Sequence, residues 1–394
     1  MATLLEVFLQ FLLLGCTSFG GPVAHLGYFH ERFVLQKRWL SAESYADLVA
    51  LCQLLPGPSS SQVGMALGLI RAGWLGGLVA WMGFTLPSAV LMVFAAALLT
   101  THPNWIQGAW VHGLLVAAVA VVAQAVLALQ RKLAPDRQRA SVMIAAAVFV
   151  LLVPHAWAQV LALLGGGLMG VFVLTPLDQE LTEQARLVVP LRRSVALMLL
   201  GLAAALLLAL PWLSATASPL VVRQLSGFLR TGALVFGGGH VVLPLLEQSL
   251  VPPGWIDLQQ FLAGYGAAQA VPGPMFSFAA FLGFDLQPGL QGIAGSVLAL
   301  IALFFPSFLL IGGLLPFWSD LGRLAPMRRA LLGINASVVG ILLAALFQPV
   351  WLTGIRGGAE FSLALVAFLL LVGWRQPAWR VVLFCAVVGG LTLS

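Results

Sequence analysis

Two proline-glycine-proline motifs are the features of this chain best suited to bind a small solute. Pro56-Gly57-Pro58 and Pro272-Gly273-Pro274 each lie inside an apolar run. A proline within a helix removes a backbone donor and clashes with the preceding turn, at about 3 kcal/mol. In lipid the freed backbone groups find no water, so such a break is tolerated mainly where it lines a cavity or is buried in protein. We therefore predict a helix interrupted at each motif, with a simple packing kink as the alternative.

Hydroxyl groups follow the first motif directly. Ser59, Ser60 and Ser61 occupy the three positions after Pro58. A helix that begins there exposes free backbone N–H groups at its positive end, beside the hydroxyls, and this arrangement binds anions. Capping of the helix end is the alternative interpretation. In the second copy only Ser277 remains, so the two breaks are not expected to be equivalent.

Glycine clusters end two other apolar runs, and a histidine follows each of them. Gly20-Gly21 and Gly237-Gly238 let the backbone approach another backbone or a ligand closely, although glycine packing without a ligand is the alternative. His25 and His240 come soon after, and a protonated histidine could bind an anion and respond to pH. The alternative for each is a hydrogen-bonded packing residue.

Amides and carboxylates complete the set of candidate residues. Gln53 and Gln269 lie one turn before the two breaks, and an amide in an otherwise apolar helix needs a polar partner. Few ionisable side chains lie in or near the apolar runs, and Glu31 and Asp47 are the first candidates for a carboxylate that carries a proton. The candidate substrate-binding residues are Gly20, Gly21, His25, Gln53, Pro56, Gly57, Pro58, Ser59, Ser60, Ser61, Gly237, Gly238, His240, Gln269, Pro272, Gly273, Pro274 and Ser277.

No catalytic, nucleotide-binding or metal-binding motif accompanies these residues in the sequence. Cys16, Cys52 and Cys385 show no metal-ligand spacing. There is no Walker A sequence, so ATP is not expected to drive transport. We therefore expect no enzyme activity, no cofactor and no metal, and an ion gradient or the membrane potential as the source of energy.

The composition places most of the chain in lipid. The sequence is 61% hydrophobic and 8% charged, whereas a soluble domain carries roughly 25% charged residues. A helix needs about 20 apolar residues to cross a bilayer, and long apolar runs recur along the whole chain. The net charge of +6 comes from Lys and Arg in short loops between these runs. This is a topology signal, so nucleic acid is not expected as a partner.

The chain contains two copies of one unit. Trp39 recurs as Trp255, and the stretch 53–58 recurs as 269–274, both 216 positions later. The glycine clusters, the pair Pro87-Ser88 and Gly113 recur in the same order, with offsets between 217 and 220. Collinear matches at a nearly constant offset indicate a duplication.

Each copy is expected to contain an opening helix, a mixed segment, the broken helix, two long helices and two shorter ones. The ranges are 3–19, 20–43, 44–71, 74–99, 105–130, 141–154 and 158–175, then 219–236, 237–257, 258–284, 289–315, 327–348, 361–374 and 379–393. An unpaired helix over 194–213 follows a polar stretch at 176–193. The chain therefore divides into a first repeat (1–175), a cytoplasmic linker with one unpaired helix (176–217) and a second repeat (218–394).

The unpaired helix and the loop charges predict that the second repeat is inverted. Six crossings plus one make an odd number, and the excess of Lys and Arg moves to the opposite loops in the second repeat. We expect an all-α polytopic membrane protein of two inverted-topology repeats with about 13 membrane segments, the N-terminus in the cytoplasm and the C-terminus outside. The segment 20–43 does not follow the positive-inside rule in this topology, because Arg32, Lys37 and Arg38 fall on the outer side. Either 44–71 and 258–284 are re-entrant, or these cations line a solute path.

Several motifs resemble those of the chromate transporter family. These are Phe19-Gly20-Gly21-Pro22, Trp39-Leu40, Cys52 through Ser59, Arg71 through Gly77 and Phe84 through Ser88, with Phe236 through His240 and Gln269 through Pro274 in the second half. The resemblance covers essentially the whole chain, and the two fused halves look like the long-chain, double-domain form. It implies a carrier that exports chromate from the cytoplasm, driven by the proton motive force, and a role in chromate resistance. It implies sulfate as the rival substrate.

The prediction is a chromate efflux carrier of the bacterial inner membrane that works by alternating access. A carrier of sulfate or another small oxyanion, with inward transport included, is the first alternative. A receptor or assembly scaffold that transports nothing is the second, although a scaffold has no need of paired helix breaks. The expected partners are chromate or sulfate and the lipid bilayer, and assembly as a homo-oligomer stays open.

Overall fold

The computed structural model describes residues 2–18, 21–101, 109–153, 158–174, 192–215, 218–235, 242–286, 289, 291–317 and 325–392. Within these ranges the regular secondary structure is helical, turns and irregular segments join the helices, and Asp285 and Gln291 form an isolated bridge. Among the described residues, five helices are long and apolar enough to cross a membrane, at Ser59–Thr101, Ala109–Arg131, Arg193–Leu210, Gly292–Phe317 and Arg329–Gly354, and five shorter apolar helices accompany them. Many large apolar side chains on these helices face outward, among them Phe94 and Phe172. The chain is therefore a multi-pass membrane protein.

The described helices follow one order in both copies. The first copy contains α1 (Ala2–Thr17), α2 (Gly21–Phe29), η1 (His30–Gln36), α3 (Ala42–Leu54), α4 (Ser59–Thr101), α5 (Ala109–Leu133), α6 (Arg137–Leu152) and α7 (Ala158–Val173). The unpaired helix α8 (Arg193–Leu213) follows. The second copy contains α9 (Leu220–Leu234), α10 (Val242–Leu250), α11 (Leu258–Ala270), η5 (Met275–Ser277), α12 (Phe278–Phe284), α13 (Gly292–Leu314), η6 (Leu315–Phe317), α15 (Ala325–Ala345), η7 (Leu346–Trp351), α16 (Leu352–Gly354), α17 (Gly358–Val372) and α18 (Ala378–Thr392).

Both predicted helix breaks are present. α3 ends at Leu54 and α4 begins at Ser59, while α11 ends at Ala270 and η5 begins at Met275. The long helices lie within a few residues of their predicted ranges, because Pro, Gly and charged residues bound the apolar runs. The stretch 20–43, predicted as mixed, is mostly helical, since α2 and the π-helix η1 fill it between Gly21 and Gln36.

α4 contains a sharp turn. Ala72 (φ −145°, ψ 24°) and Gly73 (φ 65°, ψ −157°) have non-helical backbone angles. The positive φ of Gly73 favours glycine, because a side chain would be strained there. α4 is therefore a short helix over 59–71 followed by a long one over 74–101, and only the second is long enough to cross a bilayer by itself.

The short helices of the first copy form two hairpins that open toward the same end of the molecule. Lys37, after η1, lies 3.4 Å from Glu6 near the start of α1, measured from Nζ to Oε1. Arg71, at the end of the short part of α4, lies 3.6 Å from the same carboxylate, measured from Nη2 to Oε2. The segment formed by α2 and η1 therefore runs back to the end of the molecule where α1 begins. The short part of α4 likewise runs back to the end where α3 begins. This arrangement favours the re-entrant alternative for the first broken helix over a full crossing.

Aromatic rings fasten the first hairpin to α4. Phe11 of α1 stacks on Phe33 of η1 with a centroid distance of 4.8 Å, and its ring meets Phe29 of α2 edge-on at 5.6 Å. Phe29 in turn contacts Phe84 of α4 at 5.1 Å. All four rings are fully or almost fully buried. This apolar cluster fixes the position of α2, and hence of the residues near its start.

The two copies exchange their closing helices. α17 and α18 of the second copy pack on α5 of the first, and α6 and α7 of the first copy pack on α15 of the second. Gly113 of α5 lies directly against the carbonyl of Cys385, and Gly333 of α15 lies directly against the carbonyl of Gly166. Neither glycine has room for a side chain there, so these contacts require glycine. The exchange makes the copies one intertwined unit.

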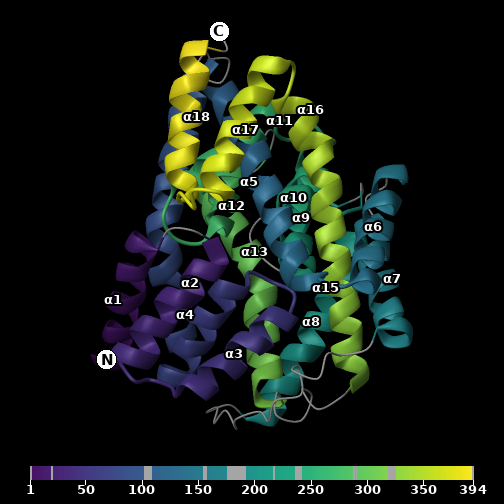
Figure 1. Ribbon diagram of the computed structural model, residues 1–394. Helices are drawn as coiled ribbons and strands as arrows, with labels where there is room; N and C mark the ends of the chain where they lie inside the picture. The colour runs from purple at the N-terminus through teal and green to yellow at the C-terminus, as the bar shows by residue number, and fades with distance from the viewer. Residues whose placement is uncertain are drawn as a thin grey trace.

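Figure 1 shows how the copies are arranged along the long axis of the molecule. The chain termini lie at opposite ends, with the N-terminus low and the C-terminus at the top. α1, α2 and α3 occupy the lower part, whereas α9, α10 and α11 occupy the upper part. The broken helices of both copies therefore approach the middle of the molecule from different ends.

Candidate functional site

Each helix break is completed by a carbonyl from the other copy. The backbone N–H of Gly57 donates a 2.6 Å hydrogen bond to the carbonyl oxygen of Val235, the residue that follows α9. The backbone N–H of Gly273 donates a 2.9 Å hydrogen bond to the carbonyl oxygen of Ser18, which follows α1. Val235 lies 217 positions after Ser18, and Gly273 lies 216 positions after Gly57. The two bonds are therefore the same contact made in both directions, and they bring the breaks together.

The central glycine of each motif is required by its conformation and its surroundings. Gly57 has a φ of +130° and Gly273 a φ of +94°, which are angles that side chains rarely adopt. A Cβ atom on Gly57 would also overlap the side chain of Gln62 and lie 2.6 Å from Oγ of Ser307. A Cβ atom on Gly273 would lie 3.0 Å from Oγ of Ser88. Ser88 and Ser307 are matching residues, so each break faces a serine on the long helix of the other copy.

Gln62 holds the first break in shape. Its Nε2 donates a 2.7 Å hydrogen bond to the carbonyl oxygen of Pro56 and lies 3.4 Å from Oγ of Ser307. Its backbone N–H donates to the carbonyl oxygen of Pro58 at 2.8 Å, which is the first helical bond after the break. The side chain is completely buried. One amide therefore satisfies the carbonyl exposed by the first proline and contacts the other copy.

The serines after the break face the start of α2. Ser59, Ser60 and Ser61 are all buried. Nδ1 of His25 lies 3.3 Å from Oγ of Ser60. His25 is 1% exposed, and its ring meets that of Phe84 edge-on at 5.2 Å. A histidine one turn into α2 thus meets a hydroxyl at the start of α4.

Several buried polar atoms in this region have no hydrogen-bond partner in the part of the chain that the structure describes. They are Oγ of Ser18, Nε2 of His25, Oγ of Ser61, Oε1 of Gln62 and Oγ1 of Thr85. Leaving such a group unpaired costs about 1–3 kcal/mol. These atoms gather around the two adjoining helix breaks, and each of them needs a partner from outside the described residues, such as a water molecule or a polar solute.

The second break is more apolar. Met275 and Phe276, which follow Pro274, are buried, and Nε2 of Gln269 lies 3.4 Å from Sδ of Met275. Ser277 is also buried, and its backbone N–H donates to the carbonyl oxygen of Pro274 at 2.9 Å. The helix after this break, α12, has 7 residues and no capping side chain. The hydrogen-bond donors therefore gather at the first break.

The remaining predicted residues lie in various places. Gly21 begins α2, and Gln53 is partly buried in the last turn of α3. Asp47 is partly buried near the middle of α3. Glu31 is exposed on η1 and accepts a 3.1 Å hydrogen bond from Nε2 of Gln36, so it lies away from the break. Gly20, Gly237, Gly238 and His240 lie outside the described residues.

Sequence reasoning overlooked four polar residues of this site. They are Gln62, Thr85, Ser88 and Ser307. Ser88 and Ser307 had a usable signal, because the pair Pro-Ser recurs in both copies, but it served only to align the repeats. In the described residues there is no group of three or more His, Cys, Asp or Glu side chains that could hold a metal ion.

The fold is that of a polytopic helical membrane protein. Residues 5–171 and 222–390 each match the chromate transporter family. The chain belongs to this family, which confirms the resemblance seen in its motifs, and the two matched ranges confirm the duplication.

Relatives extend along nearly the whole chain. A probable chromate transport protein of Synechococcus elongatus is 27% identical, covering 96% of this chain and 93% of the relative. A chromate transport protein of Pseudomonas aeruginosa is 28% identical, covering 97% and 90%. An uncharacterized transporter of Methanocaldococcus jannaschii is 27% identical, covering 99% and 94%. No solved structure matches the chain.

Proposed function

We propose that this chain is a chromate efflux carrier of the bacterial inner membrane, driven by the proton motive force and conferring chromate resistance. Its family and the relatives named as chromate transport proteins support the substrate. The observation that carries the proposal is the contact of Nδ1 of His25 with Oγ of Ser60. This contact joins the starts of α2 and α4 in a buried region rich in unpartnered polar atoms.

The backbone groups at the first break favour an anion. The first N–H groups of α2 and α4 have no acceptor within their own helices, and the positive ends of both dipoles lie here. The carbonyls of Ser18 and Val235 already accept hydrogen bonds from Gly273 and Gly57. Hydrogen-bond donors therefore predominate among the remaining backbone groups. With the hydroxyls of Ser59–Ser61 they offer an oxyanion a binding site of the kind found at helix N-termini.

The proposed topology is an inverted pair of repeats whose broken helices are re-entrant. The ion pairs of Glu6 with Lys37 and Arg71 support re-entrant hairpins in the first repeat. In each repeat the two hairpins together replace two crossings, those of the opening helix and of the broken helix, so the parity that leads to inversion is unchanged. Arg32 and Lys37 then share the side of the N-terminus with Arg131, as the positive-inside rule requires. The N-terminus is accordingly cytoplasmic and the C-terminus outside.

Alternating access would follow from the reciprocal bonds between the repeats. The bonds from Gly57 to Val235 and from Gly273 to Ser18 are matched, so a rocking movement could favour one over the other. Breaking one would open the binding site toward one end of the molecule, and breaking the other would open it toward the opposite end. Asp47 and Glu31 remain the proposed proton carriers, and Asp47 is tested first because it is partly buried in the helix that leads to the break.

The test is chromate uptake into everted membrane vesicles that contain this protein and respire. Uptake that an uncoupler abolishes, and that falls in a triple alanine variant of Ser59–Ser61, supports export and the site at the break together. Sulfate as competitor measures how far the site distinguishes two tetrahedral dianions. Absence of chromate uptake by folded protein would eliminate chromate and leave another small oxyanion, carried in either direction, as the substrate.

A further inference from the structure

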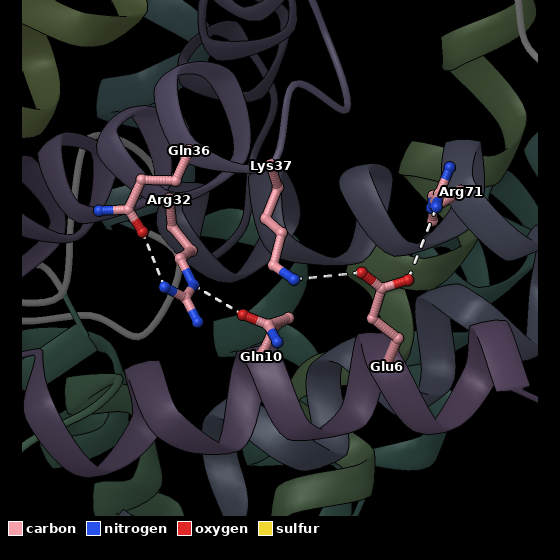
Figure 2. A network of polar contacts seen from close by, with 6 residues as sticks. All are labelled: Glu6, Gln10, Arg32, Gln36, Lys37 and Arg71. Atoms are coloured by element: carbon pink, nitrogen blue, oxygen red, sulfur yellow. Dashed lines mark hydrogen bonds and ion pairs between the residues drawn. The ribbon is translucent and has the colours of Figure 1, made fainter.

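A second group of polar side chains surrounds Glu6, at the end of the molecule where α1 begins. Figure 2 shows Lys37 and Arg71 pointing at its carboxylate from two different segments. Beside them, Nε of Arg32 donates a 2.6 Å hydrogen bond to Oε1 of Gln10, and Nη1 donates a 2.7 Å bond to Oε1 of Gln36. None of these residues contributes to the helix breaks. We call this group the Glu6 cluster.

Cations outnumber carboxylates in the segments that form the cluster. Arg32, Lys37, Arg38 and Arg71 stand against Glu6 and Glu31. Glu31 accepts a hydrogen bond from Gln36, and the carboxylate that faces Lys37 and Arg71 is that of Glu6. The surplus of positive charge raises the local concentration of anions.

The two contacts of Glu6 use separate oxygens. Oε1 meets Nζ of Lys37 at 3.4 Å, and Oε2 meets Nη2 of Arg71 at 3.6 Å. Two oxygens of a tetrahedral oxyanion could meet the same pair of cations in the same way. The three side chains are 32–43% exposed, and ion pairs of this length and exposure are weak. The carboxylate can therefore be exchanged for an anion from solution.

Arg71 is held in position independently of Glu6. Its guanidinium lies 5.3 Å from the ring centroid of Trp39, a cation–π contact that orients the planar group. A fixed guanidinium offers two parallel donors to an oxyanion, which a mobile one does not. Loss of the carboxylate would leave this donor in place.

The carboxylate is a feature of one end of the molecule only. The position that matches Glu6 in the second repeat, 217 residues later, is Arg223. Arg223 lies 5.5 Å from the ring centroid of Trp255, which itself matches Trp39. Both repeats therefore keep an arginine against the same tryptophan, but the first repeat alone has a carboxylate at the matching position. A structural requirement shared by the repeats does not explain Glu6.

We infer that Lys37 and Arg71 form a capture site for a tetrahedral oxyanion dianion, in which the carboxylate of Glu6 is a built-in competitor that the anion displaces. The inference rests on the proposed function for the direction of transport, since this end is the cytoplasmic one there. Displacement of Glu6 also removes the two ion pairs that tie α1 to Lys37 and to Arg71, whereas the bond of Arg32 to Gln10 and the aromatic contacts remain. Binding at this end would thus loosen the contacts that hold the two hairpins closed.

The test measures sulfate binding to the purified full-length protein by titration calorimetry, at constant ionic strength. Glu6→Gln removes the competitor and should tighten sulfate binding about fivefold. Lys37→Gln and Arg71→Gln should each weaken it by a similar factor, and Lys37→Arg should restore it. All variants are also compared in the triple alanine background of Ser59–Ser61, so that binding at the break does not mask the result.

Two control variants separate local contact from net charge. Arg137→Gln removes a cation from the exposed start of α6, and Glu360→Gln removes a carboxylate that pairs with His112 instead. Both should leave the dissociation constant within about twofold, because separated surface charges are screened by salt. The capture site is supported if Glu6→Gln lowers the dissociation constant for sulfate and Lys37→Gln raises it, while both controls leave it unchanged.

The inference is overturned if Glu6→Gln weakens sulfate binding or leaves it unchanged while the protein elutes and melts as the wild type does. It is equally overturned if the controls shift the constant as much as the cluster variants. Failure of the proposed function is distinguishable. If the variants change sulfate binding as predicted but the protein moves no chromate, chromate export is rejected and the capture site is kept. If the protein moves chromate but the variants do not change sulfate binding as predicted, only the capture site is rejected.

Discussion

The backbone N–H of Gly57 donates a hydrogen bond to the carbonyl oxygen of Val235, across the boundary between the two repeats. The matching bond joins Gly273 to Ser18. Neither break is therefore complete within its own repeat, and each depends on the end of the opening helix of the other. A displacement of one repeat against the other would act directly on the residues beside the proposed binding site.

Alanine at the central glycines tests this dependence. Gly57→Ala and Gly273→Ala should each lower the free energy of unfolding by about 1–3 kcal/mol, because both positions have positive φ. Gly57→Ala should be the worse of the two, since its Cβ would overlap Gln62 and crowd Ser307. Thermal unfolding in detergent and chromate flux in vesicles measure the effects.

Gly165→Ala is the matched control for these variants. A Cβ atom there has no neighbour within 4 Å, so stability and flux should stay near wild type. Equal losses at Gly57, Gly273 and Gly165 would mean that the protein tolerates no added methyl group, and the special geometry of the breaks would not be supported.

Removal of the Gln62 amide should destabilise the first break. Gln62→Leu leaves the carbonyl of Pro56 buried without its donor, at about 1–3 kcal/mol. Ser307→Ala should cost less, because Oγ of Ser307 lies 3.4 Å from the amide. Unfolding temperatures compare the two with Gln138→Leu, an exposed glutamine on α6. A smaller loss for Gln62→Leu than for Gln138→Leu would contradict the assigned role.

The contact between His25 and Ser60 should govern affinity for the anion. His25→Phe removes the imidazole donors and should raise the KM for chromate about tenfold, the loss of one hydrogen bond to a charged group. Ser60→Ala should raise it less, since neighbouring hydroxyls remain. His25→Asn, which retains a donor, should lie between wild type and His25→Phe. KM measured in everted vesicles, with protein content normalised, checks the order, and an unchanged KM in His25→Phe would remove the histidine from the site.

Local sequence signals predicted the helices and the breaks well. Pro56-Gly57-Pro58 interrupts a helix through the chemistry of its own backbone, so no distant contact is needed to locate the break. The serine-rich start of α4 follows from the same argument. The duplication was visible because matching residues such as Trp39 and Trp255 keep a nearly constant offset.

Contacts between the repeats could not be predicted in the same way. The bond from Gly57 to Val235 joins residues far apart in sequence, and no periodicity encodes it. Likewise Gln62 looks like a continuation of the serine run, and only the position of Ser307 shows that it connects the repeats. The placement of 20–43 was ambiguous because its cations fit either a re-entrant broken helix or an outer segment that lines a solute path. The ion pair of Lys37 with Glu6 favours the returning arm.

That placement yields a final prediction about membrane sidedness. Arg38 is exposed just after η1, and Arg137 is exposed at the start of α6. If the hairpins are re-entrant, single cysteines at these two positions, in a cysteine-free background, should react with a membrane-impermeant maleimide in everted vesicles and not in intact cells. Arg356→Cys, exposed before α17, should show the opposite pattern if the second repeat is inverted as proposed. Labelling of Arg38→Cys from the same side as Arg356→Cys would mean that α1 and the returning arm are separated by a full crossing, and the capture site at Glu6 would lose its cytoplasmic position.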